Sequence, residues 1–268
     1  MSKIKNKKKI IITSLALAFL VILYFIFFNQ STLEKSALIG KISSKKRCDL
    51  KNKLTGECLE KETKNLWPVS VMIDNHPDAW PQFGLNSAQL VHNTQVEGGA
   101  TRMMATFSTA GEIEKIGPVR SARPYYLTWA KGMDSVYMHA GGSPQALQNI
   151  KDWDILDCNE ITSYGPRYIF RDHNFTAPHN LFTSSQKMDL VRQEWELEPE
   201  SEFTLWQFDP RKEYSGNLAL DISIKYSRIY PYDIKYEYNT STQQYLRFQN
   251  KRPHTDALDD SQISTKNL

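Results

Sequence analysis

Two acidic residues stand where they could take part in acid–base chemistry. Glu97 follows a predicted strand and precedes two glycines, so a substrate can approach its carboxyl group closely. Glycoside cleavage usually needs two carboxyl groups flanking the bond, and Asp74 or Asp172 could supply the second. One hypothesis is therefore a cell-wall glycan hydrolase or lyase with Glu97 as general acid and Asp74 as its partner. The alternative is that Glu97 forms a salt bridge with Arg102 or Arg120.

Four arginines suggest a different chemistry, the binding of an anion. Arg120 and Arg123 are three residues apart at a predicted helix start, a spacing that can place both on one face to hold a carboxylate or phosphate. Arg102 and Arg171 could extend this basic surface. The alternative is that these arginines pair with acidic residues inside the fold. Those acidic residues are Asp74, Glu97 and Asp172.

A glycine-rich turn precedes another predicted helix, at Gly141, Gly142 and Ser143. Free backbone N–H groups at a helix N-terminus form a natural anion site. Ser143 also raises the hypothesis of a nucleophile, because His139 and His179 are available as bases. However, the segment lacks the second glycine of a G-x-S-x-G elbow. A serine directly before a helical proline is typical of an N-cap, and we favour that role.

The sequence gives no sign of a metal site or a cofactor. The six histidines are scattered, and none shows H-E-x-x-H or similar spacing. His76, His139 and His179 could converge on a metal only through the tertiary fold. Cys48 and Cys58 provide two thiolates, with no further ligands nearby to complete a zinc site. We therefore expect neither a metal nor a cofactor.

The polar residues cluster where predicted strands end. Asp74, Asn75 and His76 close the first strand, Glu97 follows the second, and His139 closes a later one. In open α/β sheets, ligands bind in the crevice beyond the carboxyl ends of the strands. If these strands are neighbours, their terminal side chains face one crevice.

The elements that would position these residues follow from hydrophobic periodicity. Strands are predicted at 67–74, 88–94, 103–108, 135–139 and 168–171, and helices at 122–133, 143–153 and 183–195. This alternation indicates an α/β domain with a mixed sheet. Residues 219–226 alternate with period two, and 234–238 and 244–249 flank a turn, so a small β-rich domain follows. Since no closing strand is predicted after 249, we expect this second domain to be incomplete.

The N-terminal 28 residues indicate the compartment. Five lysines precede an apolar run at 10–28, which as a helix reaches about 28 Å, close to a bilayer core of about 30 Å. The positive flank predicts a cytoplasmic N-terminus and extracytoplasmic domains. The run is long and no small-x-small site follows, so an uncleaved single-pass anchor is expected. The predicted organisation is a basic tail (1–9), an anchor (10–28), a stalk (29–63), an α/β domain (64–198) and a β domain (199–268).

Charge and cysteines fit an exported protein. The net charge of the 268 residues is +3, and the five N-terminal lysines exceed it, so the remainder is close to neutral. That balance argues against a general nucleic-acid binder. Cys48 and Cys58 flank a polar stretch with turn chemistry at its centre, so a disulfide loop is expected outside the membrane. Cys158, beside Ile155 and Leu156, is expected to be a buried thiol.

Several segments resemble the YerB family of bacterial envelope proteins. They are VMIDNHP (71–77), VEGG (96–99), IGPVRSARP (116–124), HAGGSP (139–144) and APHNL (177–181), and later YLRF (245–248) with His254 and Asp256. The resemblance runs from about residue 65 to the end and implies an envelope location and a two-domain architecture, without a defined activity. Relatives in that family are often lipoproteins with a cysteine after the apolar run, which is absent here. The family's second domain also normally extends further than this chain.

The leading interpretation is a membrane-anchored extracytoplasmic protein that recognises an anionic envelope component or an envelope protein. Recognition would use the Arg120 and Arg123 face and the adjoining glycine-rich loops. The alternatives are the glycan hydrolase or lyase described above, and a structural or assembly partner without a small ligand. Whether the protein is an enzyme stays open at this level.

Overall fold

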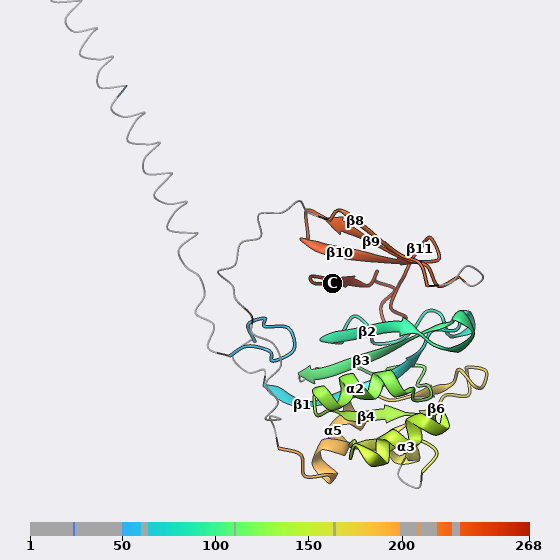
Figure 1. Cartoon of the computed structure of the whole chain (residues 1–268). Helices are drawn as coiled ribbons and strands as arrows, with labels where there is room; N and C mark the ends of the chain where they lie inside the picture. Colours follow the sequence, from blue (N-terminus) through green and yellow to red (C-terminus); the bar gives the residue numbers. More distant parts are fainter. Residues whose placement is uncertain are drawn as a thin grey trace, which may run out of the picture. The chain divides into compact units, whose positions relative to one another are not determined.

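The structure is a computed structural model that describes residues 24, 50–59, 64–109, 111–162, 165–198, 208, 219–226 and 231–268. Residues Asp49–Leu268 form one compact unit (Figure 1). No helix among the described residues is both long and apolar enough to cross a bilayer. The predicted tail and anchor lie outside the described residues, apart from Tyr24, so the anchor stays a prediction.

The main sheet has five strands in the order β2 (Leu90–Gln95), β3 (Thr101–Thr109), β1 (Asn65–Asp74), β4 (Val136–His139) and β5 (Asp157–Asn159). β3 is antiparallel to both β1 and β2, whereas β4 is parallel to β1 and β5 is parallel to β4. The carboxyl ends of β1, β2, β4 and β5 therefore lie at the same edge of the sheet. From the sequence, a shared edge was expected for the first, second and fourth of the predicted strands, on the condition that they are neighbours.

Helices and loops cover both faces of this sheet, and the alternation along β1 explains why. Val71 and Ile73 join one apolar cluster with Met188 of α5 (Ser185–Glu194). Met72 points the other way, into a cluster with helices α2 (Pro124–Gly132) and α3 (Pro144–Asp152). Successive strand residues face opposite sides, so a strand covered on both faces is apolar throughout. The result is a three-layer arrangement with β1 at its centre (Figure 1).

A second, antiparallel sheet is built by the C-terminal residues. Its order is β11 (Arg252–Pro253), β10 (Gln244–Gln249), β9 (Ile234–Asn239) and β8 (Asp221–Ile224), and β12 (Ser264–Thr265) also pairs with β10. The remaining elements are a two-stranded sheet of β6 (Phe170–Arg171) and β7 (Leu181–Phe182), the helix α4 (Gly165–Tyr168), and the 3₁₀ turns η1 (Pro77–Ala79) and η2 (Glu97–Gly99).

A buried carboxylate joins the C-terminal residues to the loop after β1. Both oxygens of Asp256 accept hydrogen bonds at 2.9 Å, one from the amide of Gly84 and the other from the amide of Asn86. The amide of Ala257 also donates to the Gln82 carbonyl at 2.8 Å. Because these are backbone donors, the attachment depends on the loop path more than on its side chains.

The predicted elements agree with the structure except at three places. Residues 168–171 were predicted as one strand, but α4 ends at Tyr168 and only Phe170–Arg171 is extended. The short strands β5, β7, β11 and β12 were not predicted, because two or three residues carry no periodic pattern. The predicted stalk was wrong for residues 50–59. Leu54 is buried against the α2 face of the sheet and Asn52 donates to Ser108, so this segment is part of the folded unit.

Candidate functional site

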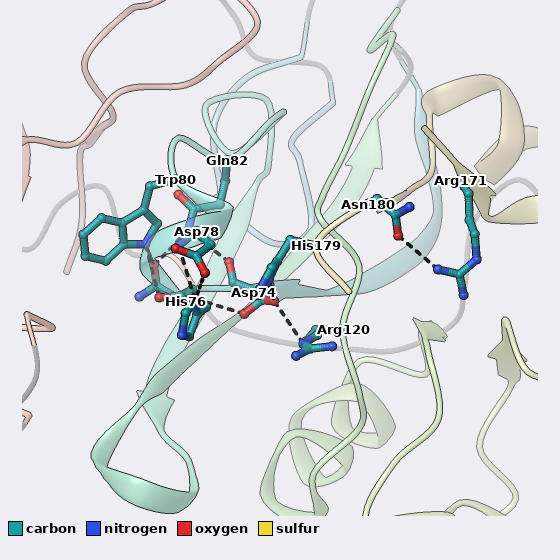
Figure 2. Close-up of polar contacts among 10 residues, drawn as sticks. Asp74, His76, Asp78, Trp80, Gln82, Arg120, Arg171, His179 and Asn180 are labelled. Carbon is teal, nitrogen blue, oxygen red and sulfur yellow. Dashed lines mark hydrogen bonds and ion pairs between the residues drawn. The ribbon is translucent and has the colours of Figure 1, made fainter. Parts of the chain in front are cut away.

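A buried carboxylate, Asp74, is the centre of the polar cluster at the carboxyl edge of the main sheet (Figure 2). Its Oδ2 accepts a hydrogen bond from Nδ1 of His179 at 2.8 Å and lies 3.0 Å from Nε of Arg120. Its Oδ1 accepts from the backbone amide of His76 at 3.0 Å. One carboxylate thus holds together three residues that come from three separate segments.

The sheet edge positions Arg120 directly. The amide of Arg120 donates to the Met72 carbonyl of β1 at 2.9 Å, and its carbonyl accepts from the Ala140 amide after β4 at 3.1 Å. The residue therefore lies across the ends of two parallel strands, at the kind of position where open α/β sheets bind ligands. The register also places Asp74 opposite Arg102 of β3, which in turn lies opposite Thr94 of β2.

Arg120 keeps donor capacity despite its ion pair. Its Nε is close to Asp74 but is not aligned for a hydrogen bond with any residue that the structure describes. About a quarter of the side chain, 27%, is exposed. Nε itself is buried beside Asp74, so an anion can reach only the exposed part of the guanidinium group. That exposed part can still donate charge-assisted hydrogen bonds to an anion.

Arg123 and Arg102 add further positive charge to the cluster around Asp74. Nε of Arg123 is 2.7 Å from both carboxylate oxygens of Glu97, while Arg102 donates to the Ser121 carbonyl at 2.9 Å. Burial, followed by the charge of Arg123, lowers the pKa of Arg102, and Arg120, Asp74 and Glu97 also act on it. The three guanidinium groups and two carboxylates therefore form one electrostatic cluster, as the sequence suggested.

The spacing argument for Arg120 and Arg123 was wrong in its geometry. Both residues precede α2, which begins at Pro124, and Arg123 has an extended backbone at the N-cap position. A helical i, i+3 relationship therefore does not apply. They come near each other because the 116–123 segment crosses the sheet edge, and each already has an acidic neighbour, Asp74 and Glu97 respectively.

Glu97 does not have the surroundings of a general acid. Its side chain is 63% exposed and carries the bidentate contact with Arg123. Burial by itself raises the pKa of Glu97, but the hydrogen bonds and charge of Arg123 outweigh it and leave the pKa lowered. A glycosidase acid needs a raised pKa to hold its proton near neutral pH. The salt-bridge alternative thus describes Glu97 better, with Arg123 in place of the expected partners.

The rings of His76 and His179 stack near Asp74, with centroids 5.0 Å apart and planes 18° apart (Figure 2). Asp78, which follows His76 in the η1 turn, brings its carboxylate to 3.4 Å from Nδ1 of His76. One ligand atom from each of these three residues lies within 4.8 Å of the other two. The tertiary fold has brought two of the three candidate histidines together.

His139, the third histidine, has a structural role instead. It is fully buried, with Nδ1 2.7 Å from the Gly141 carbonyl and Nε2 2.6 Å from Oδ1 of Asp157. Both ring nitrogens are therefore occupied, and the expectation that His139 binds a ligand was wrong. Its contacts fix the turn after β4.

The glycine-rich turn is likewise occupied by internal hydrogen bonds. Asn159 accepts from the Gly141 amide at 2.9 Å, and the Ser143 amide donates to the Ala122 carbonyl at 3.3 Å. Gly141 has a φ of 63°, and Gly142 packs close to Ala122, so both glycines serve this turn. Ser143 Oγ caps α3 by accepting from the Ala146 amide at 3.2 Å. These contacts contradict the predicted anion site at this helix N-terminus and support the capping role.

Asn75 was predicted to bind a ligand, but its side chain is buried in a network. Its Nδ2 donates to Thr101 Oγ1 at 2.7 Å, and its Oδ1 accepts from Trp80, Gln82 and Gln249. Because its side chain is buried and hydrogen-bonded at both ends of the amide, Asn75 supports the site rather than contacting a ligand. The network was missed because Gln82 and Gln249 carry no recognisable spacing with Asn75.

Arg171 and Asp172 belong to other contacts. Arg171 donates to Oδ1 of Asn180 at 3.0 Å (Figure 2). It also donates to Glu160 at 3.1 Å, so its guanidinium has partners of its own. Asp172 forms an ion pair with Lys115 at 2.7 Å, which lowers the pKa of the carboxyl group. Neither joins the Asp74 cluster through a contact in the described part of the chain.

One member of the cluster was missed from the sequence. Asp78 was not considered, although His76-Pro77-Asp78 contains the local signal: a proline at the first position of a tight turn brings residues on either side of it close together. No local signal in the sequence indicated that His179 lies near Asp74, because 105 positions separate the two residues.

The cysteines agree with the prediction as far as they are described. Cys58 is disulfide-bonded, while Cys48, its predicted partner, lies outside the described residues, so the pairing stays a prediction. Cys158 is a free, buried thiol as expected, and burial raises its pKa to about 12.

The fold and the cluster define a mixed α/β protein with an Asp–His–Arg site at the carboxyl edge of its main sheet, joined to an antiparallel C-terminal sheet. A family model described as "Protein of unknown function (DUF3048) N-terminal domain" matches residues 54–196. The chain belongs to this family, and the resemblance to YerB proteins is confirmed.

The relatives extend the match beyond the family model. YerB, a predicted lipoprotein of Bacillus subtilis (strain 168), is 30% identical over 227 residues, which cover 81% of this chain and 66% of YerB. The crystal structure of YerB from Bacillus subtilis matches with a TM-score of 0.69 and 27% identity, over 81% of this chain and 72% of that one. The chain thus spans about two thirds of the length of its relative.

Proposed function

We propose that this protein is a membrane-anchored extracytoplasmic protein that binds an anionic group of a cell-envelope component at the Asp74 cluster, through Arg120. The observation that carries the proposal is the state of the Arg120 guanidinium. It lies at the ends of β1 and β4, is partly exposed, and has an Nε without a directed hydrogen bond among the described residues.

The neighbouring side chains add further anion-binding groups. Arg102 and Arg123 add two guanidinium groups to that of Arg120. The carboxylates of Asp74, Glu97 and Asp78 balance these three charges, so the support for an anion comes from the guanidinium groups themselves and not from the net charge. A guanidinium group matches the planar fork of a carboxylate or phosphate, so either envelope anion suits the site.

Separate observations support the proposed extracytoplasmic location. The lysine-flanked apolar run at 10–28 favours an anchor with a cytoplasmic N-terminus. YerB, the relative, is a predicted lipoprotein, which places it outside the cytoplasm at a membrane. The disulfide-bonded state of Cys58 also fits an oxidising compartment.

The hydrolase or lyase alternative has weaker support. The lowered pKa of Glu97 opposes its use as general acid, and the oxygens of Asp74 are held by His179, Arg120 and a backbone amide. The third alternative, an assembly partner without a small ligand, predicts that loss of the Arg120 charge has no effect on binding.

The test is co-sedimentation of the full chain, in detergent, with isolated cell-wall sacculi. Three preparations distinguish phosphate from carboxylate as the bound anion. They are native sacculi, sacculi stripped of phosphate polymers, and stripped sacculi with amidated carboxyl groups. We expect binding that weakens with salt and falls at least about tenfold in Arg120→Ala, because a charge-assisted hydrogen bond is lost. Arg120→Lys keeps the charge but not the fork, so an intermediate loss is expected.

Arg252→Ala is the matched control, because Arg252 is an exposed arginine in β11 of the C-terminal sheet. Thermal unfolding of each variant shows whether a loss of binding reflects a loss of fold. Unchanged binding by a folded Arg120→Ala variant would contradict the proposal and direct the search to protein partners. Release of muropeptides by the parent protein, but not by Glu97→Gln, would establish the hydrolase or lyase instead.

A further inference from the structure

The arrangement of His76, Asp78 and His179 suggests that the cluster can also bind a metal ion. We propose that these three residues form a binding site for Zn²⁺ or a divalent transition-metal ion with similar ligand preferences. The proposal goes beyond anion recognition and does not rest on it, since it uses different side chains and its test contains no anionic ligand.

His179 is already oriented as a metal ligand. Its Nδ1 lies 2.8 Å from the Oδ2 of Asp74, and because a carboxylate can only accept, Nδ1 carries the proton. Nε2 is then the nitrogen with a free lone pair. Metal-bound histidines commonly donate their other ring nitrogen to a carboxylate, which fixes the ring and raises its basicity. Asp74, 5% exposed in its side chain, provides this support.

The η1 turn supplies the other two ligands. His76 is the N-cap of the turn, Pro77 is its first residue, and Asp78 follows, so both side chains leave the chain on the same side. His76 and Asp78 have side chains 51% and 73% exposed, so they can rotate at little cost. Nδ1 of His76 accepts a long hydrogen bond of 3.3 Å from the Asp78 amide, so its lone pair is only weakly held and can be given up to a metal ion.

The distances require only a small rearrangement. One ligand atom from each residue lies within 4.8 Å of the others. Ligands at zinc–ligand distances of about 2.1 Å in a tetrahedron are about 3.4 Å apart. Rotation of the two exposed side chains would therefore be needed to bring their ligand atoms to coordinating distances.

The donor set selects the class of metal. Two imidazoles and one carboxylate suit zinc and its neighbours, whereas magnesium and calcium prefer ligands that are all oxygen. Three protein ligands also leave a fourth tetrahedral position open, the pattern of non-structural zinc sites. The carboxylates of Asp74 and Asp78 offset the positive charge of Arg120 near the ion.

Titration of the full chain with Zn²⁺ alone tests the proposal. The protein is purified in detergent without a histidine tag, stripped with a chelator, and titrated in a calorimeter, with Mg²⁺ and Ca²⁺ in parallel. We expect one Zn²⁺ per chain with micromolar or tighter affinity, and at least tenfold weaker binding by His76→Ala and by Asp78→Asn. Both residues are exposed, so these variants should fold even where His179→Ala does not.

His173→Ala is the matched control, because His173 is an exposed histidine in the loop that leads to His179. It should bind Zn²⁺ like the parent protein. The absence of stoichiometric Zn²⁺ binding would overturn the proposal. So would binding that persists unchanged in a folded His76→Ala, Asp78→Asn double variant.

Discussion

The side-chain oxygen of Asn75 accepts a hydrogen bond from Nε2 of Gln249 at 2.9 Å, across 174 positions of the chain. The same oxygen accepts from Nε1 of Trp80 and Nε2 of Gln82, both at 2.8 Å. Asn75 follows the last residue of β1, and Gln249 is the last residue of β10. This one amide therefore connects the edge of the main sheet, where Asp74 lies, with the C-terminal sheet.

Replacement of Asn75 by alanine should destabilise the protein strongly. Gln82 and Gln249 would lose their buried acceptor and Thr101 its donor, and buried polar groups left without partners cost about 1–3 kcal/mol each. We expect the free energy of unfolding to fall by about 3 kcal/mol, measured by urea denaturation. Asn174→Ala, at an exposed loop position, is the control and should change it by less than about 0.5 kcal/mol. An equally small effect of Asn75→Ala would show that the network contributes little.

Ser143→Ala separates the capping role from the nucleophile. Loss of the N-cap hydrogen bond to the Ala146 amide should lower the free energy of unfolding by about 1 kcal/mol. Ser143→Asp preserves a capping oxygen and should restore most of that loss. Thermal unfolding of the three proteins measures the effect, while binding to sacculi should be the same in all of them. Loss of a hydrolytic activity in both variants would instead identify Ser143 as a nucleophile.

Stability should depend on pH through His92. Burial lowers the pKa of this histidine from 6.5 to about 4, and its ring stacks on Trp129 with centroids 4.5 Å apart. The folded state therefore binds a proton less readily than the unfolded state. The lowered pKa of His92 makes its full contribution to the free energy of unfolding above pH 6.5. That contribution is lost as the pH falls from 6.5 towards 4, by no more than about 3 kcal/mol in total.

His92→Phe tests that assignment because phenylalanine keeps the stacking on Trp129 but cannot be protonated. Urea denaturation between pH 4 and pH 8 should show a flatter profile for this variant than for the parent. His173→Ala, at an exposed position, should leave the slope as it is. A parent-like slope in His92→Phe would assign the acid sensitivity to other groups.

The three cysteines should differ in their reactivity towards a maleimide. Cys58 is disulfide-bonded, and Cys158 is buried with a pKa raised to about 12, so the native protein should take up almost no label. Denaturation without reductant should expose one thiol, and denaturation with reductant should expose three, as counted by intact mass. Peptide mapping without reduction should show Cys48 linked to Cys58. Two or more thiols in the unreduced, denatured protein would exclude that disulfide.

Much of the fold followed from local patterns. The cap of α3 lies where Ser-Pro precedes helical spacing, and the alternating segments form β8, β9 and β10. Each of these signals acts over a few residues, which is why sequence alone could identify them. The common edge for the ends of β1, β2 and β4 was expected only on the condition that the strands are neighbours, and the strand order that fulfils it came from the structure.

The functional site was only partly predictable. Arg120 was a candidate through its spacing from Arg123, and His179 as a possible base or metal ligand. Sequence placed Asp74 and His76 among the candidates because polar side chains at strand ends are typical of α/β ligand sites. It gave the same weight to Asn75, His139 and Ser143, whose polar groups are taken up by internal hydrogen bonds. Residue type cannot distinguish these cases, because the same amide or imidazole serves either a ligand or the fold.

What the sequence determined by itself was the class of protein: strands, helices, a mixed sheet, a second β unit and the family resemblance, all of which depend on local periodicity or contiguous motifs. Tertiary structure alone decided which polar groups meet. His179 reaches Asp74 across 105 positions, and Gln249 reaches Asn75 across 174. Such contacts depend on where the sheet edge brings separate segments together, and on which donors are left unsatisfied once the core has formed. Because internal partners do not use all of their polar atoms, Arg120, His76 and Asp78 are the residues for which we propose a ligand from outside the chain.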